Sequence, residues 1–173
     1  MNTCAKCHQM GNGCCFMKDL NISNQIGITQ SDINKIKEFT GKSENEFIIS
    51  DMVTDEYLKS LVDNIHPVFN NIYENHTRHR LKTVHERCVF LSQQGCELPV
   101  EIRPIYCRLY PFWLSPDNKH IIVLPAYECL AQKKSTLSWK IVNEHFGYTE
   151  EYIKNLFSEL LKLFFSEIVK PVF

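Results

Sequence analysis

Apolar residues recur at helical spacing in two stretches of the chain. Residues 32–39 place an apolar side chain at every third position and are followed by Gly41, which predicts a short helix that stops at this glycine. The stretch from Thr149 to about Lys170 has a longer apolar side, made of Ile153, Leu156, Phe157, Leu160, Leu161, Phe164 and Ile168. Lysines alternate with glutamates on its other side, so it lacks the basic face of a membrane-surface helix. We therefore expect an amphipathic C-terminal helix that packs in the core.

Three weaker signals indicate further helices. Residues 43–46 read Ser-x-x-Glu, the spacing of a capping box, which predicts a helix start. Residues 54–75 have a looser helical pattern that is interrupted by Pro67. A proline can begin a helix because its missing N–H is not needed there, so Pro104 predicts a helix that Pro111 ends.

The middle of the chain carries β signals. Cys88-Val89-Phe90-Leu91 is a β-rich run, and the turn sequence of residues 92–95 precedes Cys96. This pattern predicts a hairpin that brings Cys88 and Cys96 from opposite strands towards one point. Residues 120–124 predict a strand that leads towards Cys129.

Composition fits one domain that folds around its own core. The chain has 173 residues, 44% of them hydrophobic and 23% charged, and no repeat or low-complexity linker divides it. We therefore expect a small single α+β domain over residues 1–173, with short β-hairpin elements and the C-terminal helix.

Charge and hydropathy narrow the classes of partner. The 19 Lys and Arg residues against 20 Asp and Glu residues give a net charge of −1, which argues against binding to the phosphate backbone of nucleic acid. The chain shows no export-signal pattern at its start and no run of about 20 apolar residues. We expect a cytoplasmic protein without a membrane span.

Cysteines give the strongest chemical signal in the sequence. There are eight, four of them within the first 15 residues: Cys4, Cys7, Cys14, Cys15, Cys88, Cys96, Cys107 and Cys129. Disulfides are rare in reducing compartments, so this many cysteines in a cytoplasmic chain indicate metal binding. We predict that all eight are candidate ligands of a cysteine-rich metal-binding centre.

The number of ligands leaves the metal open. A 4Fe–4S cluster and a tetrahedral zinc site each take four cysteines, so eight thiolates can form two sites, or one site with cysteines to spare. Zinc ribbons combine two Cys-x-x-Cys pairs, whereas this chain has one, Cys4 and Cys7. The spacing favours an iron–sulfur cluster over zinc.

Basic residues flank one of the cysteines. If Pro104 starts a helix, Cys107 lies near its N-terminal end, where backbone N–H groups favour a thiolate over a thiol. Arg103 and Arg108 flank Cys107, and their donors would compensate the negative charge of a thiolate site around the metal. The alternative is that both arginines hold loops together or lie in water.

The cysteine pattern is similar to that of a known family. Its most specific part is the run Arg103-Pro104-x-x-Cys107-Arg108-x-x-Pro111-Phe112, preceded by the N-terminal Cys-x-x-Cys and Cys-Cys motifs. In these features, spread over residues 4–129, the chain resembles the YkgJ-type cysteine-cluster family, a zinc- or iron-chelating domain. In the family, two or three residues usually separate the second cysteine from the Cys-Cys pair. Here six residues separate Cys7 from Cys14. The resemblance implies a bound zinc ion or iron–sulfur cluster, and a related branch resembles flagellin lysine methylases.

Three functions are compatible with these observations. The first is an iron–sulfur protein with a redox or electron-transfer role and a protein redox partner. The second is a zinc-binding structural or interaction module. The third, implied by the resemblance alone, is a lysine methyltransferase-like protein of the flagellin methylase branch. The sequence identifies no catalytic residue, so it leaves open whether the protein is an enzyme.

Overall fold

The structure combines helices with short antiparallel hairpins. The computed structural model describes residues 6, 15, 27–64, 67, 69, 73, 76–124, 130–133 and 138–168. The helices are α2 (Gln30–Thr40), α3 (Glu44–Phe47), α4 (Asp55–Asn64), α6 (Ile105–Leu109), α7 (Leu130–Lys133), α8 (Trp139–Asn143) and α9 (Glu150–Ile168). The strands are β1 (Ile48–Met52), β2 (Thr77–Leu81), β3 (Thr83–Val84), β4 (Arg87–Cys88), β5 (Leu91–Ser92), β6 (Gly95–Cys96), β7 (Phe112–Leu114) and β8 (Ile121–Val123). In the described residues they pair as β1–β2, β3–β4, β5–β6 and β7–β8, which confirms the α+β expectation.

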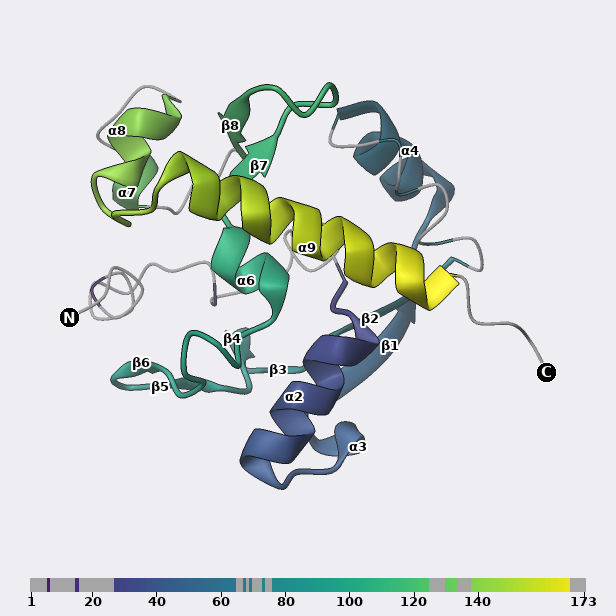
Figure 1. Ribbon diagram of the computed structural model, residues 1–173. Helices are drawn as coiled ribbons and strands as arrows, with labels where there is room; N and C mark the ends of the chain where they lie inside the picture. The colour runs from purple at the N-terminus through teal and green to yellow at the C-terminus, as the bar shows by residue number, and fades with distance from the viewer. Residues whose placement is uncertain are drawn as a thin grey trace.

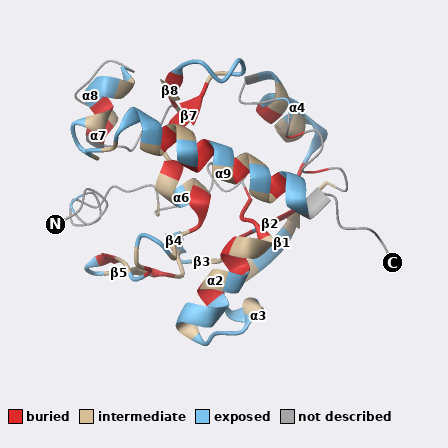
Figure 2. Ribbon diagram, viewed as in Figure 1, coloured by how far each residue is buried: buried red, intermediate tan, exposed pale blue. Residues whose placement is uncertain are grey.

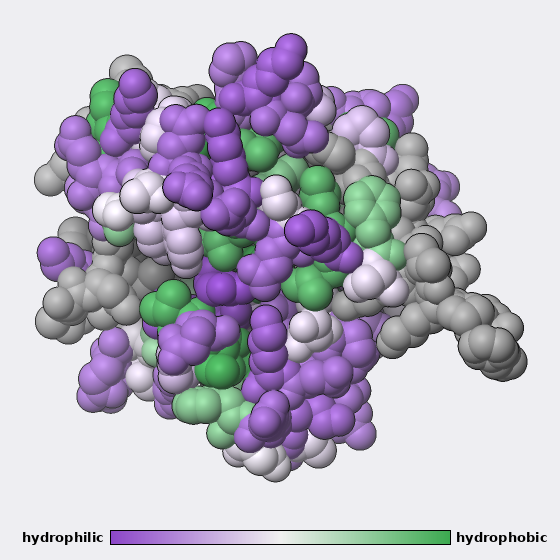
Figure 3. All heavy atoms as spheres, in the orientation of Figure 1, coloured by the Kyte–Doolittle hydropathy of each residue, from purple (hydrophilic) through white to green (hydrophobic). Residues whose placement is uncertain are grey.

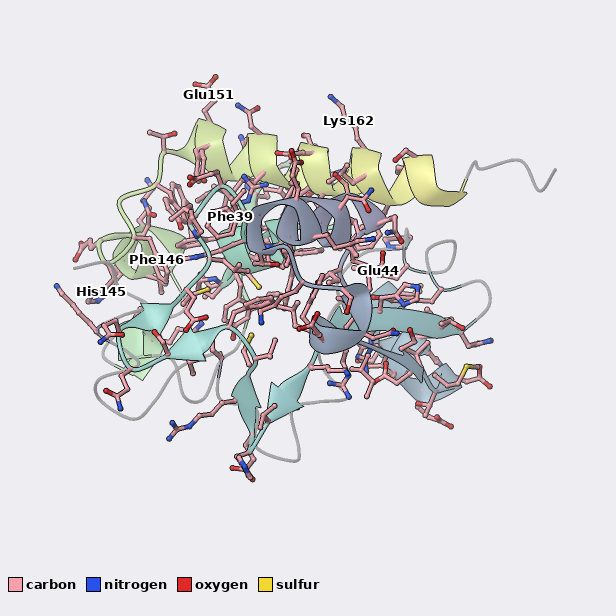
Figure 4. The ribbon with its side chains drawn as sticks, turned by 90° about the horizontal axis from the view of Figure 1, so that it is seen from below. Phe39, Glu44, His145, Phe146, Glu151 and Lys162 are labelled. Carbon is pink, nitrogen blue, oxygen red and sulfur yellow. The ribbon has the colours of Figure 1, made fainter. Side chains whose placement is uncertain are left out.

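The long helix α9 crosses the molecule and covers its larger core (Figure 1). One side of the helix is buried and the other faces solvent (Figure 2). Glu151 and Lys162 point away from the body of the molecule (Figure 4). The buried residues of α9 are Ile153, Leu156, Phe157, Leu160 and Phe164. The predicted C-terminal helix and its packing in the core are confirmed.

Aromatic rings fill the larger core. Trp113 is fully buried, and its ring meets that of Phe157 edge-on, with the centroids 4.9 Å apart. Phe69 stacks against the same indole, with the centroids 6.1 Å apart. The larger core consists of Val53, Leu61, Phe69, Tyr73, Ile105, Leu109, Phe112, Trp113, Leu114, Ile121, Val123, Ala131, Val142, Ile153, Leu156, Phe157, Leu160 and Phe164. Large apolar side chains of this kind supply most of the hydrophobic stabilisation of a domain.

A smaller core lies between α2, α3 and the hairpins β3–β4 and β5–β6. Its buried members are Ile28, Ile33, Ile36, Phe47, Phe90 and Leu98. Cys88, Val89 and Cys96 pack against it while remaining half-buried. Two of the predicted ligands therefore lie at the margin of the smaller core.

One side of the smaller core is open to solvent. Phe39, near the end of α2, is 52% exposed and lines an open depression with Lys35, Glu38 and Ile102. Figure 3 shows apolar side chains gathered on this face, between α2 and the small hairpins. The described part of the chain thus covers the smaller core less completely than α9 covers the larger one.

Side chains cap the N-termini of α2 and α3. Thr29 and Asp32 form a reciprocal capping box at α2, and Ser43 and Glu46 form one at α3. Helix α2 ends at Gly41, whose φ of 68° is a left-handed conformation that glycine adopts without steric cost. The predicted short helix, its stop at glycine and the helix start after Ser43 are confirmed.

The other predicted elements are found in part. Helix α4 covers the first half of the stretch 54–75, and most of the rest lies outside the described residues. Helix α6 lies between the two prolines, and β8 falls within 120–124, as predicted. None of the helices in the described ranges is both long enough and apolar enough to cross a membrane.

The predicted cysteine hairpin is found in part. Its turn at residues 92–95 is confirmed, with Ser92 opposite Gly95 and Leu91 opposite Cys96. Cys88 belongs to a separate hairpin, in which it pairs with Thr83. The loop of the first hairpin consists of His85 and Glu86, with φ values of 49° and 63°. Two successive left-handed residues make the tight turn that suits a two-residue hairpin loop, but Asn and Gly usually occupy it. Without those residues the sequence did not reveal the turn.

The ribbon β1–β2 was not predicted from the sequence. Its strand β2 buries Arg78 and Arg80, so the strand lacks the apolar alternation by which strands are recognised. Both guanidinium groups bind Asp51: Arg78 Nε and Nη2 lie 2.9 and 3.0 Å from its two oxygens, and Arg80 Nε lies at 2.6 Å. Burial raises the pKa of Asp51, but the two arginines outweigh this effect and lower it below its usual value.

Candidate metal centre

Half of the predicted ligands can be placed in the structure. Cys15, Cys88 and Cys96 are half-buried, and Cys107 is exposed. Cys4, Cys7, Cys14 and Cys129 lie outside the described residues. The cysteines that can be placed are thus the second one of the Cys-Cys pair, one on each of the two small hairpins, and one on helix α6.

A backbone hydrogen bond joins Cys15 to the first hairpin. The N–H of Cys88 donates to the carbonyl oxygen of Cys15 at 2.9 Å. Strand β4 is already paired with β3 on its other side, so Cys15 adds to the outer edge of this hairpin. Two cysteines that are far apart in the sequence are thus held side by side by the backbone.

A backbone hydrogen bond extends each of the two hairpins by one further pair of residues. Val89 N–H donates to Lys82 C=O at 3.0 Å, and Glu97 N–H donates to Phe90 C=O at 2.9 Å. Phe90, between the hairpins, is buried in the smaller core and lies 5.7 Å from Phe47, centroid to centroid. Phe90 therefore anchors the segment that carries Cys88 and Cys96.

Helix α6 presents Cys107 at the surface. Ile105 and Leu109 are fully buried under α9, while Cys107 lies on the exposed side of the same helix. Cysteine is among the most often buried residue types, so an exposed cysteine on an otherwise well-packed helix is unusual. The structure confirms the predicted helix, in which Cys107 is the third of five residues and so lies in the middle, not near the N-terminal end as predicted.

The described cysteines do not form a complete ligand set. Within the described ranges, no three His, Cys, Asp or Glu side chains lie close enough together to hold a metal ion. A complete site would need cysteines from outside these ranges, namely Cys4, Cys7, Cys14 or Cys129. The metal-binding centre itself therefore stays a prediction.

The two arginines predicted to lie near the ligands have other contacts. Arg103 Nε donates to the carbonyl oxygen of Leu98 at 2.9 Å and so holds the loop before α6. Arg108 Nη2 lies 3.5 Å from Glu159 Oε1 on α9. These contacts match the alternative in which both arginines hold the fold together. The compensation of thiolate charge stays a prediction for both.

Arg108 nevertheless keeps one unused donor. Its Nε is buried and has no hydrogen-bond acceptor in the described structure. Buried donors are nearly always paired, so an unpaired guanidinium nitrogen indicates an acceptor that is still missing. An anionic thiolate centre would be an acceptor of the right charge. The unpaired Nε of Arg108 is therefore compatible with such a group.

Asp32 belongs to this region, although the sequence does not mark it as a functional residue. Its carboxylate is 1% exposed and joins α2 to α6: Oδ2 accepts the N–H and hydroxyl of Thr29 at 3.2 and 2.9 Å, and Oδ1 accepts the N–H of Ile105 at 3.1 Å. Burial raises the pKa of Asp32, and its bonds with Thr29 and Ile105 oppose this shift. The spacing of Thr29 and Asp32 indicates the cap of α2, but no local signal could have revealed the bond to α6.

Comparisons with known proteins give a distant relative and no family. No protein-family model matches the chain. No solved structure matches it either. An uncharacterized protein of Methanocaldococcus jannaschii, MJ0939, is 27% identical over 95 residues, which cover 51% of this chain and 34% of that protein. The chain thus spans about a third of the length of that relative. The resemblance to the cysteine-cluster family still rests on the cysteine motif alone.

Proposed function

We propose that this chain holds a 4Fe–4S cluster on cysteines of its N-terminal group, the two small hairpins and α6, and that it transfers electrons. The observation that carries the proposal is the hydrogen bond between Cys88 N–H and Cys15 C=O, at 2.9 Å. It brings Cys15 to the hairpin that carries another predicted ligand. Ligands gathered from distant parts of a chain are a common arrangement for such clusters.

The build of the small hairpins supports a bound group in this region. The paired strands have two residues each, and isolated two-stranded hairpins are marginally stable at best. The loop before Cys88 also holds His85 and Glu86 in left-handed backbone conformations, which disfavour ordinary side chains. A metal bound by these hairpins would supply stability that their own packing does not, because metal binding and folding are coupled.

The residues of the chain have distinct parts in the proposal. Cys15, Cys88, Cys96 and Cys107 supply thiolates from the described structure, and Cys4, Cys7, Cys14 and Cys129 are the ligands proposed from sequence alone. The buried Nε of Arg108 would donate to the anionic site. A bound 4Fe–4S cluster supplies one-electron redox chemistry, so the partners are an electron-donating and an electron-accepting protein. A reducing compartment such as the cytoplasm would keep the cysteines as thiols.

Metal analysis of protein purified without oxygen tests the proposal. We expect about four iron and four sulfide per chain and a brown absorption that bleaches on reduction. Cys15→Ser and Cys88→Ser should lose most of the iron. Val84→Ala is the matched control, because Val84 is exposed on the same hairpin and carries no thiol.

The same measurement separates the competing function. Zinc without sulfide would overturn the cluster and support a zinc-binding structural or interaction module. Full iron and sulfide in Cys88→Ser would overturn the place of Cys88 in the site. Protein without any metal after anaerobic purification and reconstitution with iron and sulfide would overturn the metal centre altogether.

A further inference from the structure

We infer that Asp32 is a positioning residue, whose buried carboxylate fixes the helix that carries Cys107 and so sets the place of this thiol in the metal centre. The effect on the metal centre rests on the proposed function. The anchoring of the helix rests on the structure alone, and the two can be tested separately.

The contact reaches the first backbone N–H of α6. Pro104 precedes the helix and has no N–H, so Ile105 is the first residue that can donate, and its N–H lies 3.1 Å from Asp32 Oδ1. Cys107 follows two residues later in the same turn. A displacement of this turn therefore moves the thiol directly.

Helix α6 needs an anchor from elsewhere in the chain. It has five residues, far fewer than an isolated helix needs to be stable in water. Its N-cap is Pro104, which makes no side-chain cap hydrogen bond. Asp32 supplies the missing cap from α2, and the burial of Ile105 and Leu109 holds the other side of the helix.

Asp32 and Glu46 cap their helices in the same way, but only Asp32 is buried. Capping of its own helix therefore does not explain why Asp32 is buried. Glu46 caps α3 in the same reciprocal way, with Oε2 accepting the N–H and hydroxyl of Ser43 at 2.8 and 2.9 Å, yet it is exposed. A carboxylate can therefore cap a helix in this chain without leaving water. Since burial of a carboxylate disfavours its charged form, the burial of Asp32 is explained by its second partner, the α6 amide.

The test compares Asp32→Ala with two variants that damage a cap and leave α6 untouched. Thr29→Ala removes the hydroxyl from the same capping box, and Glu46→Ala removes the capping carboxylate of α3. In metal-free protein, we measure the alkylation rate of Cys107 by mass spectrometry of its peptide under native conditions. We expect Asp32→Ala to change this rate about tenfold, the effect of one lost cap on the ordering of α6, and the two controls to leave it unchanged.

A second readout concerns the metal centre. In protein that holds its cluster, Asp32→Ala should change the reduction potential and the electron paramagnetic resonance signal, whereas Thr29→Ala and Glu46→Ala should leave both as in the wild type. Asp32→Asn keeps one carbonyl oxygen for the Ile105 amide and should restore most of the wild-type signal. If Asp32→Ala does not fold, Asp32→Asn is compared with the controls in its place, with a smaller change in the same direction.

The outcomes distinguish the inference from the proposed function. A wild type with a cluster, and Asp32 variants with unchanged potential, signal and Cys107 reactivity, would overturn the positioning role and leave the function standing. A wild type without metal, in which Asp32→Ala alone changes Cys107 reactivity, would overturn the function and support the anchoring. Equal changes in Asp32→Ala and Thr29→Ala would reduce Asp32 to a cap of α2 and overturn the inference.

Discussion

The larger core under α9 and the smaller core beside α2 differ in what holds them together. The larger core packs fully buried aromatic rings, with Trp113 in contact with both Phe69 and Phe157. The smaller core has fewer buried side chains, an exposed Phe39 at its margin and half-buried cysteines along its edge. Its hairpins have strands of two residues. Aromatic packing holds the first region, and the second is the region in which we propose a bound metal.

The difference between the two cores agrees with the proposed place of the metal centre. A tightly packed core tolerates few changes of shape, so it suits a scaffold. The described cysteines lie instead outside this core: three are half-buried on or beside the small hairpins, and Cys107 is on the exposed side of a short helix. Two contacts connect the two regions: Asp32 of α2 accepts the first N–H of α6, and Lys35 of α2 lies 3.9 Å from Glu159 of α9.

The largest expected effect comes from the larger core. Phe157→Ala should lower the free energy of unfolding by about 3–5 kcal/mol, because it leaves a cavity beside the Trp113 ring. The loss should be the same with and without metal. Denaturant unfolding monitored by circular dichroism measures it. Phe165→Ala, on the exposed side of the same helix, should change stability by less than about 0.5 kcal/mol.

The β1–β2 ribbon should show the next largest effect. Asp51→Asn leaves two buried guanidinium groups without their anionic partner and should lower the free energy of unfolding by about 3 kcal/mol. Asp63→Asn, an exposed change on α4, is the control and should have an effect within about 0.5 kcal/mol. An effect no larger than that of the control would contradict a stabilising role for this ion pair.

The same pair predicts a dependence on pH. The folded-state pKa of Asp51 is lowered, so its contribution is fully present above the unfolded pKa of about 3.9 and is lost as the pH falls through the folded value. Wild-type stability should therefore decrease below about pH 4. The free energy of unfolding, measured at several pH values across this window, should depend less steeply on pH in Asp51→Asn than in the wild type. Equal slopes would refute the assignment to Asp51.

Removal of the proposed metal should affect one region selectively. After chelation, or in Cys88→Ser, we expect the backbone amides of residues 82–97 to exchange with solvent about 100-fold faster, equivalent to about 2.7 kcal/mol of local stability. The amides in the middle of α9 should keep their protection. Hydrogen exchange with residue resolution measures both. Equal loss in the two regions would show that the cores are one cooperative unit.

The smallest effect concerns the turn before Cys88. Glu86→Gly should stabilise metal-free protein by about 1 kcal/mol, because glycine adopts the left-handed φ of 63° without steric cost. Gly41→Ala is the converse change at a φ of 68°, in open space, and should destabilise by about the same amount. Thermal unfolding of the two variants should shift in opposite directions. Destabilisation by Glu86→Gly would mean that this turn does not exist in the metal-free protein.

Elements whose signals lie within a few residues could be predicted from the sequence. The period of apolar residues indicated α9, the glycine stop indicated the end of α2, and the two prolines delimited α6. The ribbon β1–β2 was missed because its buried positions hold Arg78 and Arg80, which only an ion pair across the ribbon makes tolerable. The turn of residues 92–95 was predicted, but the β3–β4 hairpin was missed because His85 and Glu86 make a turn that local propensity disfavours.

For the candidate site, the sequence by itself determined the ligand chemistry: eight thiols, their grouping and the arginines beside one of them. These depend on residue type and spacing, which are local. Only the tertiary structure decided which distant groups meet: the Cys15 carbonyl accepts the N–H of Cys88, and the Asp32 carboxylate accepts the first N–H of α6. Hydrogen bonds between remote segments depend on how the two cores pack around them, and no window of the sequence contains that information.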